Sequence, residues 1–169
     1  MTPVLRTERL VLEPYVREDE ADFVALFQDT RVSQWMGEGP DTEENDRALF
    51  GRVFTKVYAT NAFDVWAVRE NGLYVGHAEI KHTEDAGGHE LIYALAADAW
   101  GRGLGTELAQ GIIDYGFDAL GLAEVHATIA EPNTASIAVM EKLGFAHLRD
   151  IPEADGSTTK HMVLKRPGA

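Results

Sequence analysis

Apolar residues recur along the chain with two different periods, and the segments that they mark predict a mixed α/β protein. Repeats of three or four residues indicate amphipathic helices at 17–28, 42–58, 103–120 and 134–143. Short runs of β-branched and aromatic residues predict strands at 5–14, 63–69, 74–82, 89–95, 124–130, 146–151 and 160–165. The order of these elements indicates one sheet with helices on both faces, in a single domain that spans residues 1–169.

A glycine-rich loop lies between the strand expected at 89–95 and the longest expected helix. It reads Trp100-Gly101-Arg102-Gly103-Leu104-Gly105-Thr106. Glycines let a ligand approach the backbone, and the first N–H groups of a helix point at an anion, so the loop predicts a phosphate site. It lacks the Lys-Ser or Lys-Thr of nucleotide-triphosphate loops, and its Gly-x-Gly-x-Gly spacing differs from the dinucleotide fingerprint. The spacing alone is also compatible with a plain turn before a helix.

A second motif follows the strand expected at 124–130, and its local pattern is that of a capped helix. Asn133 is a good N-cap, Ile137, Met140 and Leu143 recur on one face, and Gly144 supplies the stop. Taken by itself, the pattern predicts a helix and no particular chemistry.

Together the two motifs resemble those of the GNAT superfamily of acetyl-CoA-dependent N-acetyltransferases. The glycine loop resembles the Gln/Arg-x-x-Gly-x-Gly/Ala pattern except at its first position, and residues 133–145 resemble the second motif on the coenzyme A side. Residues 7–14 and 29–36 resemble the branch that includes the ribosomal-protein N-terminal alanine and serine acetyltransferases. The resemblance implies a mostly antiparallel sheet of six or seven strands, splayed between the fourth and the fifth.

The resemblance also implies acetyl-CoA as co-substrate and assigns residues to it. Backbone contacts to the pantetheine arm would come from Ala94, Leu95 and Ala96. The pyrophosphate would lie on Trp100, Gly101, Arg102, Gly103, Leu104, Gly105 and Thr106. Asn133 would hydrogen-bond the arm near the acetyl group. Trp100 departs from the usual Gln or Arg, and its indole can cover coenzyme A by stacking, although a charge or a hydrogen bond is lost.

Acetyl transfer needs a neutral amine, and the cost of deprotonation decides how much a general base matters. At pH 7 this cost is about 4.6 kcal/mol for a lysine amine and about 1 kcal/mol for a peptide α-amine. The resemblance points to Glu90 as the base, and Glu79 on the neighbouring strand is the rival. Either glutamate has a plainer interpretation as a solvated strand residue.

The leaving thiolate must gain a proton, and the position that often holds a tyrosine in the family is Met140. Methionine cannot donate a proton, so the resemblance to the ribosomal-protein branch implies Ser136, whose plainer role is to cap or pack its helix. A backbone N–H near Leu95 would hold the oxyanion. The acceptor side is expected at Trp35 and Met36, with Glu79 nearby, although Trp35 also suits a core or lid aromatic.

The composition limits the kinds of molecule that the chain is expected to bind. With 15 basic and 28 acidic side chains, the formal net charge is −13, which disfavours nucleic acid and anionic membranes and suits a cationic amine, although solubility alone also explains it. The chain has no cysteine, so direct attack without a covalent carrier is expected. The histidine spacings predict no metal. No signal peptide or membrane span is recognised, so the cytoplasm is expected, and a homodimer is compatible with the family.

Two other functions stay open at this point. One is a non-catalytic acyl-CoA-binding or sensing domain that keeps the cofactor site. The other is a structural partner of the ribosome with vestigial chemistry. The acceptor also stays open, among peptide α-amines, polyamines, amino acids, aminoglycosides and other small amines.

Overall fold

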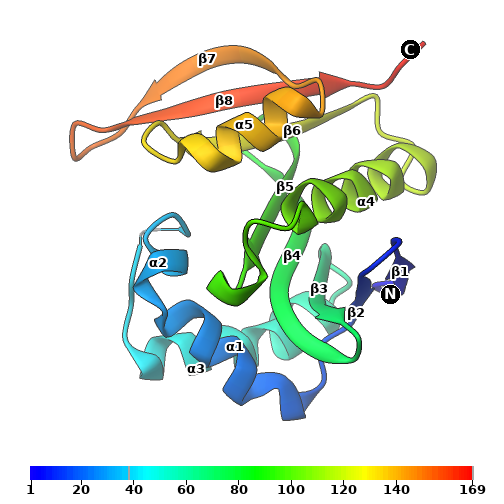
Figure 1. Ribbon diagram of the computed structural model, residues 1–169, viewed down its shortest axis with the longest axis vertical. Coiled ribbons are helices and arrows are strands. Elements are labelled where there is room, and N and C mark those ends of the chain that lie inside the picture. Colours follow the sequence, from blue (N-terminus) through cyan, green and yellow to red (C-terminus); the bar gives the residue numbers. More distant parts are fainter. Residues whose placement is uncertain (38, 169) are drawn as a thin grey trace.

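The computed structural model describes residues 1–37 and 39–168, which form an eight-stranded sheet with helices on both faces (Figure 1). The strands are β1 (Leu5–Arg6), β2 (Val11–Glu13), β3 (Asp64–Glu70), β4 (Leu73–Thr83), β5 (Gly88–Leu95), β6 (Glu124–Ala130), β7 (Ala146–Pro152) and β8 (Thr158–Lys165). The α-helices are α1 (Glu20–Gln28), α2 (Thr30–Ser33), α3 (Glu43–Arg52), α4 (Leu104–Asp118) and α5 (Thr134–Lys142). Shorter helical segments are η1 (Arg17–Asp19), η2 (Val53–Tyr58) and η3 (Ala97–Ala99). This mixed α/β architecture confirms the predicted fold class.

The sheet splits between β5 and β6, which are its one parallel pair among the described strands. The strand order is β1-β2-β3-β4-β5-β6-β8-β7, and every pair of neighbours is antiparallel except β5 with β6. β4 and β5 pair from Gly76↔Leu95 to Thr83↔Gly88, whereas β5 and β6 share the register pair Glu90↔His126 alone. The two strands therefore diverge beyond Glu90, as the predicted splay requires.

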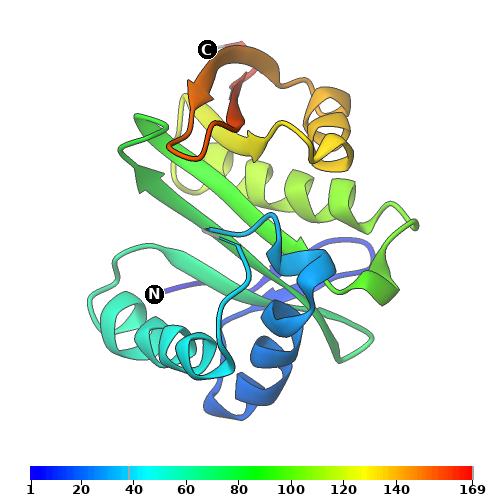
Figure 2. The same cartoon turned by 90° about the vertical axis from the view of Figure 1, so that its left-hand side faces the viewer.

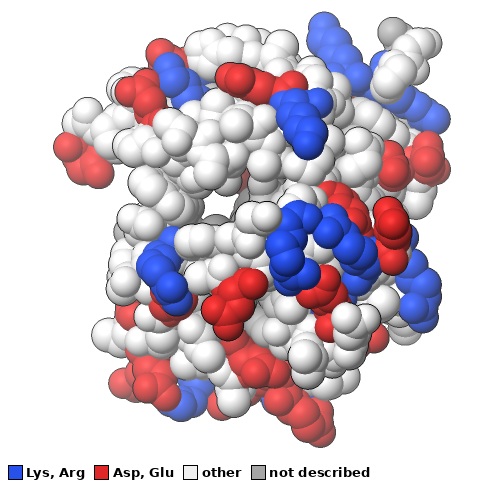
Figure 3. Space-filling model, viewed as in Figure 1, with Lys and Arg blue, Asp and Glu red and all other residues white. Residues whose placement is uncertain are grey.

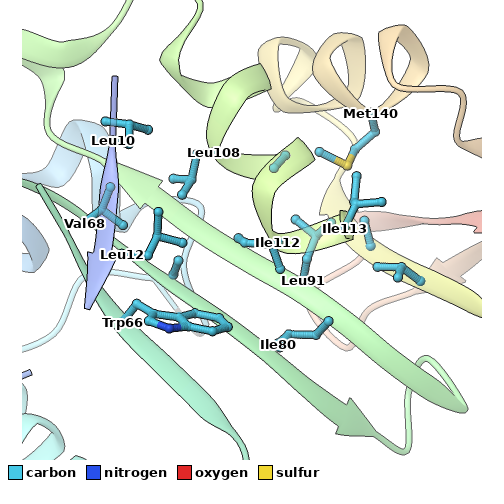
Figure 4. Close-up of a cluster of buried hydrophobic side chains, with 14 of the residues drawn as sticks. Leu10, Leu12, Trp66, Val68, Ile80, Leu91, Leu108, Ile112, Ile113 and Met140 are labelled. Atoms are coloured by element: carbon cyan, nitrogen blue, oxygen red, sulfur yellow. The ribbon is translucent and has the colours of Figure 1, made fainter. Parts of the chain in front are cut away.

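Two hydrophobic clusters hold the layers on the opposite faces of the sheet. On the first face, α4 packs Leu108, Ile112 and Ile113 against Trp66 and Leu91 of the strands (Figure 4). On the second face, α1 and α3 pack mainly through aromatic side chains, which include Phe23, Phe27 and Phe50. The 90° turn in Figure 2 shows α4 and α5 on one side of the strands and α1 and α3 on the other. Burial on both faces makes the sheet a fixed frame for the site.

The first expected strand, 5–14, is divided by a turn, and this raises the strand number to eight. The Thr7 N–H donates to the Leu10 carbonyl oxygen over 2.9 Å, and the turn is held from α4 by Glu107. The sequence pattern does not predict α2, because four residues show no period. Asp29 caps this helix by accepting a hydrogen bond of 3.1 Å from the Arg31 N–H.

No helix in the described part of the chain has both the length and the apolar character that crossing a bilayer demands.

Candidate active site

A cleft of about 540 Å³ opens where β5 and β6 diverge. Leu91, Tyr93 and Leu95 line it from the side of α4, whereas Ala94 belongs to the cluster on the α1 side. The cleft therefore passes between the strands from one face of the sheet toward the other. Figure 3 shows the hollow at the middle of the molecule, bordered mainly by uncharged side chains.

The glycine loop forms the N-terminal end of α4 at one rim of this cleft. Gly101 and Gly103 have φ angles of 76° and 79°, a left-handed conformation that residues with a Cβ rarely adopt. Gly103 is the N-cap of α4 and offers no side chain as a cap. The first N–H groups of α4 therefore point toward the rim that Gly105 and Thr106 line, where an anion would satisfy them.

The arginine in this loop does not face the cleft. Arg102 donates two hydrogen bonds of 2.9 Å to the Glu70 carboxylate at the end of β3. Its carbonyl oxygen accepts a hydrogen bond of 2.7 Å from Nη1 of Arg9, in the turn before β2. The sequence predicts that Arg102 meets the pyrophosphate, but the structure holds its side chain against β3.

The edge of β5 that faces β6 carries free backbone groups. The Ala96 N–H donates to the Val75 carbonyl oxygen of β4 over 2.8 Å. Backbone groups alternate in direction along an antiparallel ladder, so those of Ala94 also face β4, whereas those of Tyr93 and Leu95 face the gap. Trp100 Nε1 donates to the Leu95 carbonyl oxygen over 2.8 Å. Tyr93 and Leu95 therefore offer the N–H groups that the sequence places near Leu95, and Ala96 does not.

Two residues with hydroxyl groups line the α5 side of the cleft. Asn133 caps α5 and accepts from the Ser136 N–H over 3.4 Å, and both residues line the cleft. Tyr93 of β5 lines the same cleft; burial raises the pKa of Tyr93, and the nearby Ser136 hydroxyl group opposes the rise only in part. Sequence reasoning missed Tyr93, although the alternation along 91–95 puts it on the same face as Leu91 and Leu95.

Glu90 lies at the point where β5 and β6 diverge. It is not among the described residues that line the cleft, but it contacts Thr128, which is. It is 7% exposed, and it accepts hydrogen bonds from Thr83 Oγ1 (3.0 Å) and, more weakly, from Thr128 Oγ1 (3.4 Å). Burial raises the pKa of Glu90, and the hydroxyl groups of Thr83 and Thr128 offset this only in part. Thr128 lines the cleft, so Glu90 is a basic carboxylate in contact with its wall.

Glu79 is held in a different way. It lies opposite Ile92 in the β4–β5 register, its Oε1 is 2.8 Å from His77 Nε2, and its Oε2 is 3.4 Å from Lys81 Nζ. Burial favours the neutral acid, but the hydrogen bond and charge of His77, together with Lys81, leave the pKa of Glu79 below its ordinary value. His77 is itself hydrogen-bonded to Tyr15 Oη over 2.7 Å. Glu79 is therefore the weaker base of the two glutamates.

The opposite end of the cleft is formed by the segment after α2. Trp35 and Met36, the residues expected on the acceptor side, line it together with Val32. Of the described residues that line the cleft, Arg31 alone has a charged side chain, and Asp29 accepts hydrogen bonds of 2.9 and 2.7 Å from its guanidinium. This end therefore combines apolar side chains with the amide of Gln34, and its one cation is already paired.

The structure brings most of the predicted site residues to one cleft. Those that line it are Trp35, Met36, Ala94, Leu95, Trp100, Gly101, Gly103, Leu104, Gly105, Thr106, Asn133 and Ser136. Ala96, Arg102, Glu79 and Glu90 are not among the described lining residues. Within residues 1–37 and 39–168, no three histidine or acidic side chains are grouped so as to hold a metal ion.

Comparison with known proteins agrees with this geometry. Residues 9–146 match the family described as "Acetyltransferase (GNAT) domain". The chain belongs to this family. The uncharacterized N-acetyltransferase p20 of Bacillus licheniformis is 30% identical over 166 residues, which cover 90% of this chain and 89% of that protein.

Solved GNAT structures share the fold. A GNAT-family acetyltransferase from Bacillus anthracis superposes with a TM-score of 0.82 at 22% identity, over 96% of this chain and 98% of the other. RimJ of Mycobacterium smegmatis, in complex with CoA-disulfide, superposes with a TM-score of 0.79 at 20% identity, over 96% and 86% of the two chains. The protein is thus a GNAT N-acetyltransferase, and its predicted resemblance to the ribosomal-protein branch holds for the fold.

Proposed function

We propose that residues 1–169 form a single GNAT domain that transfers the acetyl group of acetyl-CoA to a primary amine. The amine is the α-amine of a peptide or belongs to a small molecule. The observation that carries the proposal is that the free backbone edge of β5 and the uncapped N-terminus of α4 lie along one cleft. An extended amide-containing arm that ends in a diphosphate suits both features, because the arm can pair with the edge and the diphosphate can accept from the helix.

The residues of the cleft support direct attack of the amine on the thioester. The Tyr93 or Leu95 N–H would stabilise the carbonyl oxygen as it gains negative charge. The new C–N bond forms as the C–S bond breaks, the amine proton passes to Glu90, and a hydroxyl group donates a proton to the departing sulfur. Ser136 and Tyr93 are the candidates for this hydroxyl group.

Glu90 would act through water. Tyr93 lies three positions further along β5, which is about 10 Å at the rise of an extended chain. A water chain past Thr128 would bridge this separation, since Thr128 contacts both Glu90 and the cleft. Glu79 stays the rival base, disfavoured by its lowered pKa.

The test is an amine panel with acetyl-CoA, read by released thiol and by the mass gain of one acetyl group. The panel contains peptides that begin with alanine or serine, a polyamine, free amino acids and an aminoglycoside. We expect stoichiometric thiol release and acetylated product with at least one of these amines. Coenzyme A binding by calorimetry without turnover on any amine would overturn the proposal in favour of an acyl-CoA-binding domain.

A matched pair of variants tests the donor end. Gly103→Glu places a side chain and a negative charge at the left-handed N-cap of α4, so it should abolish coenzyme A binding. Gly156→Glu makes the same change at a left-handed glycine in the β7–β8 turn, with open space around it. This control should bind coenzyme A as the parent does. Equal binding by both variants would refute the assignment of the donor end.

A further inference from the structure

The turn between β1 and β2 is fastened to the first turn of α4 from outside the cleft. Arg9 donates from Nε to Glu107 Oε1 over 2.7 Å and from its backbone N–H to Glu107 Oε2 over 2.8 Å. Thr7 Oγ1 donates to the same Oε2 over 2.5 Å. These residues lie about a hundred positions from Glu107 in the sequence, so the contacts are tertiary and specific to the fold.

Glu107 is a carboxylate at an end of a helix where an anion is expected to bind. It lies in the first turn of α4, whose N–H groups face the cleft. Burial raises the pKa of Glu107, but the hydrogen bonds from Thr7 and Arg9 outweigh it and keep the pKa low. The ionised carboxylate would repel a diphosphate at this end unless a cation compensates it. Arg9 supplies that cation.

Arg9 also holds the glycine loop itself. Its Nη1 donates to the Arg102 carbonyl oxygen over 2.7 Å, and a Cβ built on Gly103 would lie 3.5 Å from its Nη2. The guanidinium therefore spans the loop backbone and the first turn of α4. A loop with two left-handed glycines has many conformations available when unsupported, so an external brace reduces the entropy lost on binding a ligand.

We propose that Arg9 is a positioning residue for the diphosphate of coenzyme A. It fixes the glycine loop through Arg102 and cancels the charge of Glu107, so that the N-terminus of α4 stays attractive to an anion. The proposal rests on the proposed function in that it takes coenzyme A as the ligand of this loop.

The test compares the affinities of Arg9→Ala and of the parent for coenzyme A and for pantetheine, which lacks the diphosphate. Calorimetry should show that Arg9→Ala weakens coenzyme A binding at least about fivefold and leaves pantetheine binding unchanged. Arg9→Lys keeps the charge but cannot bridge both partners, so its affinity should lie between those of Arg9→Ala and the parent. Arg6→Ala, on the outer strand β1, is the matched control and should bind both compounds as the parent does.

A double variant separates the charge from the brace. Glu107→Gln in the Arg9→Ala background removes the uncompensated carboxylate and should restore part of the lost coenzyme A affinity. Unchanged coenzyme A affinity in Arg9→Ala would overturn the proposal, and so would an equal loss for coenzyme A and pantetheine, which indicates a general structural role. If Arg9→Ala fails to fold, Arg9→Lys gives the same comparison. These readouts are binding constants, so they test the role of Arg9 even when no amine in the panel is acetylated. Failure to acetylate any amine would instead refute the proposed function.

Discussion

The indole N–H of Trp100 donates a hydrogen bond of 2.8 Å to the carbonyl oxygen of Leu95, the last residue of β5. This carbonyl points into the gap, where β6 has already moved away and gives it no strand partner. Trp100 stands where the GNAT pattern has Gln or Arg, and here its side chain closes the open end of the strand. The substitution therefore replaces a polar side chain by one that still donates a hydrogen bond.

Trp100→Phe should lower the free energy of unfolding by about 1 kcal/mol, because it removes this hydrogen bond and keeps an aromatic ring. It should also weaken coenzyme A binding, since the end of β5 becomes less ordered. Urea denaturation and calorimetry measure the two effects. Trp35→Phe, at the acceptor end of the cleft, is the control and should leave coenzyme A affinity unchanged. Parent-like values for Trp100→Phe would contradict this role of the indole.

Glu90→Gln should lower kcat about a hundredfold for an amine as basic as lysine and less than about tenfold for an α-amine, which needs little help to lose its proton. The amide can still accept from Thr83 and Thr128, so the fold is expected to persist. Glu84→Gln, in an exposed turn, is the matched control.

The pH profile gives a second test of Glu90. Because burial raises the pKa of Glu90, the acid limb of kcat/KM should lie above the ordinary glutamate range and should vanish in Glu90→Gln. A variant that keeps both the parental rate and the acid limb would exclude Glu90 as the base and leave Glu79 as the candidate.

The sequence predicts those parts of the site whose conformation depends on residues close by in the chain. The left-handed glycines before α4 and the Asn133 cap of α5 depend on local conformation, so spacing alone places them. The pairing of Arg102 with Glu70 joins residues that are 32 positions apart, and it turns the predicted phosphate ligand away from the cleft. A pattern of neighbouring residues does not predict an ion pair between positions so far apart in the chain.

The backbone edge of β5 is a second feature that local sequence patterns do not predict. The sequence places the backbone contacts at three successive residues, but the direction of each N–H depends on which neighbour the strand pairs with. The Ala96 N–H pairs with β4, and this becomes visible only once the register of β4 with β5 is known. Tyr93 was hidden for a related reason, because it shares a cleft with Ser136 only once β5 and α5 are placed relative to each other.

Ser136→Ala and Tyr93→Phe test the source of the proton for the departing thiolate. Each single change should lower kcat about tenfold or less, because the other hydroxyl group remains, and the double variant should lose more than the sum of the two free-energy effects. A thioester whose thiol is more acidic needs less protonation, so it should restore the rate of the double variant. Equal losses with both thioesters would show that neither hydroxyl group donates this proton.

A hydrogen-bond chain through two buried histidines joins β6, β8 and β7, and its direction is fixed by its ends. Arg149 Nε donates to His161 Nδ1 over 3.1 Å, His161 Nε2 lies 2.9 Å from His126 Nδ1, and His126 Nε2 lies 3.0 Å from Glu124 Oε1. Arginine only donates and a carboxylate only accepts, so along this chain each histidine accepts at Nδ1 and donates from Nε2.

This chain predicts a loss of stability in mild acid. Burial, followed by His126 and Arg149, lowers the pKa of His161 from its ordinary value of 6.5. The unfolded chain therefore binds a proton more readily than the folded one, and the free energy of unfolding should fall as the pH drops below about 6.5. Arg149→Met removes a charge that lowers the pKa of His161, so the contribution of this histidine to the fall should be smaller. Urea denaturation of both proteins at several pH values measures the two slopes; identical slopes would contradict the assignment.

Residues from both faces of the sheet line the gap between β5 and β6, and the lining runs from the start of α4 to Trp35. A compound seated at the start of α4 leaves the end beside Trp35 unoccupied. One molecule that carried both a thioester-like arm and an amine body, tethered through the gap, would fill both ends at once. Once one end of this molecule is bound, the other end would bind at an effective concentration of about millimolar. The second binding event would therefore not cost the translational freedom of another free molecule. A bisubstrate inhibitor is accordingly a ligand that would span this divided sheet from one end of the cleft to the other.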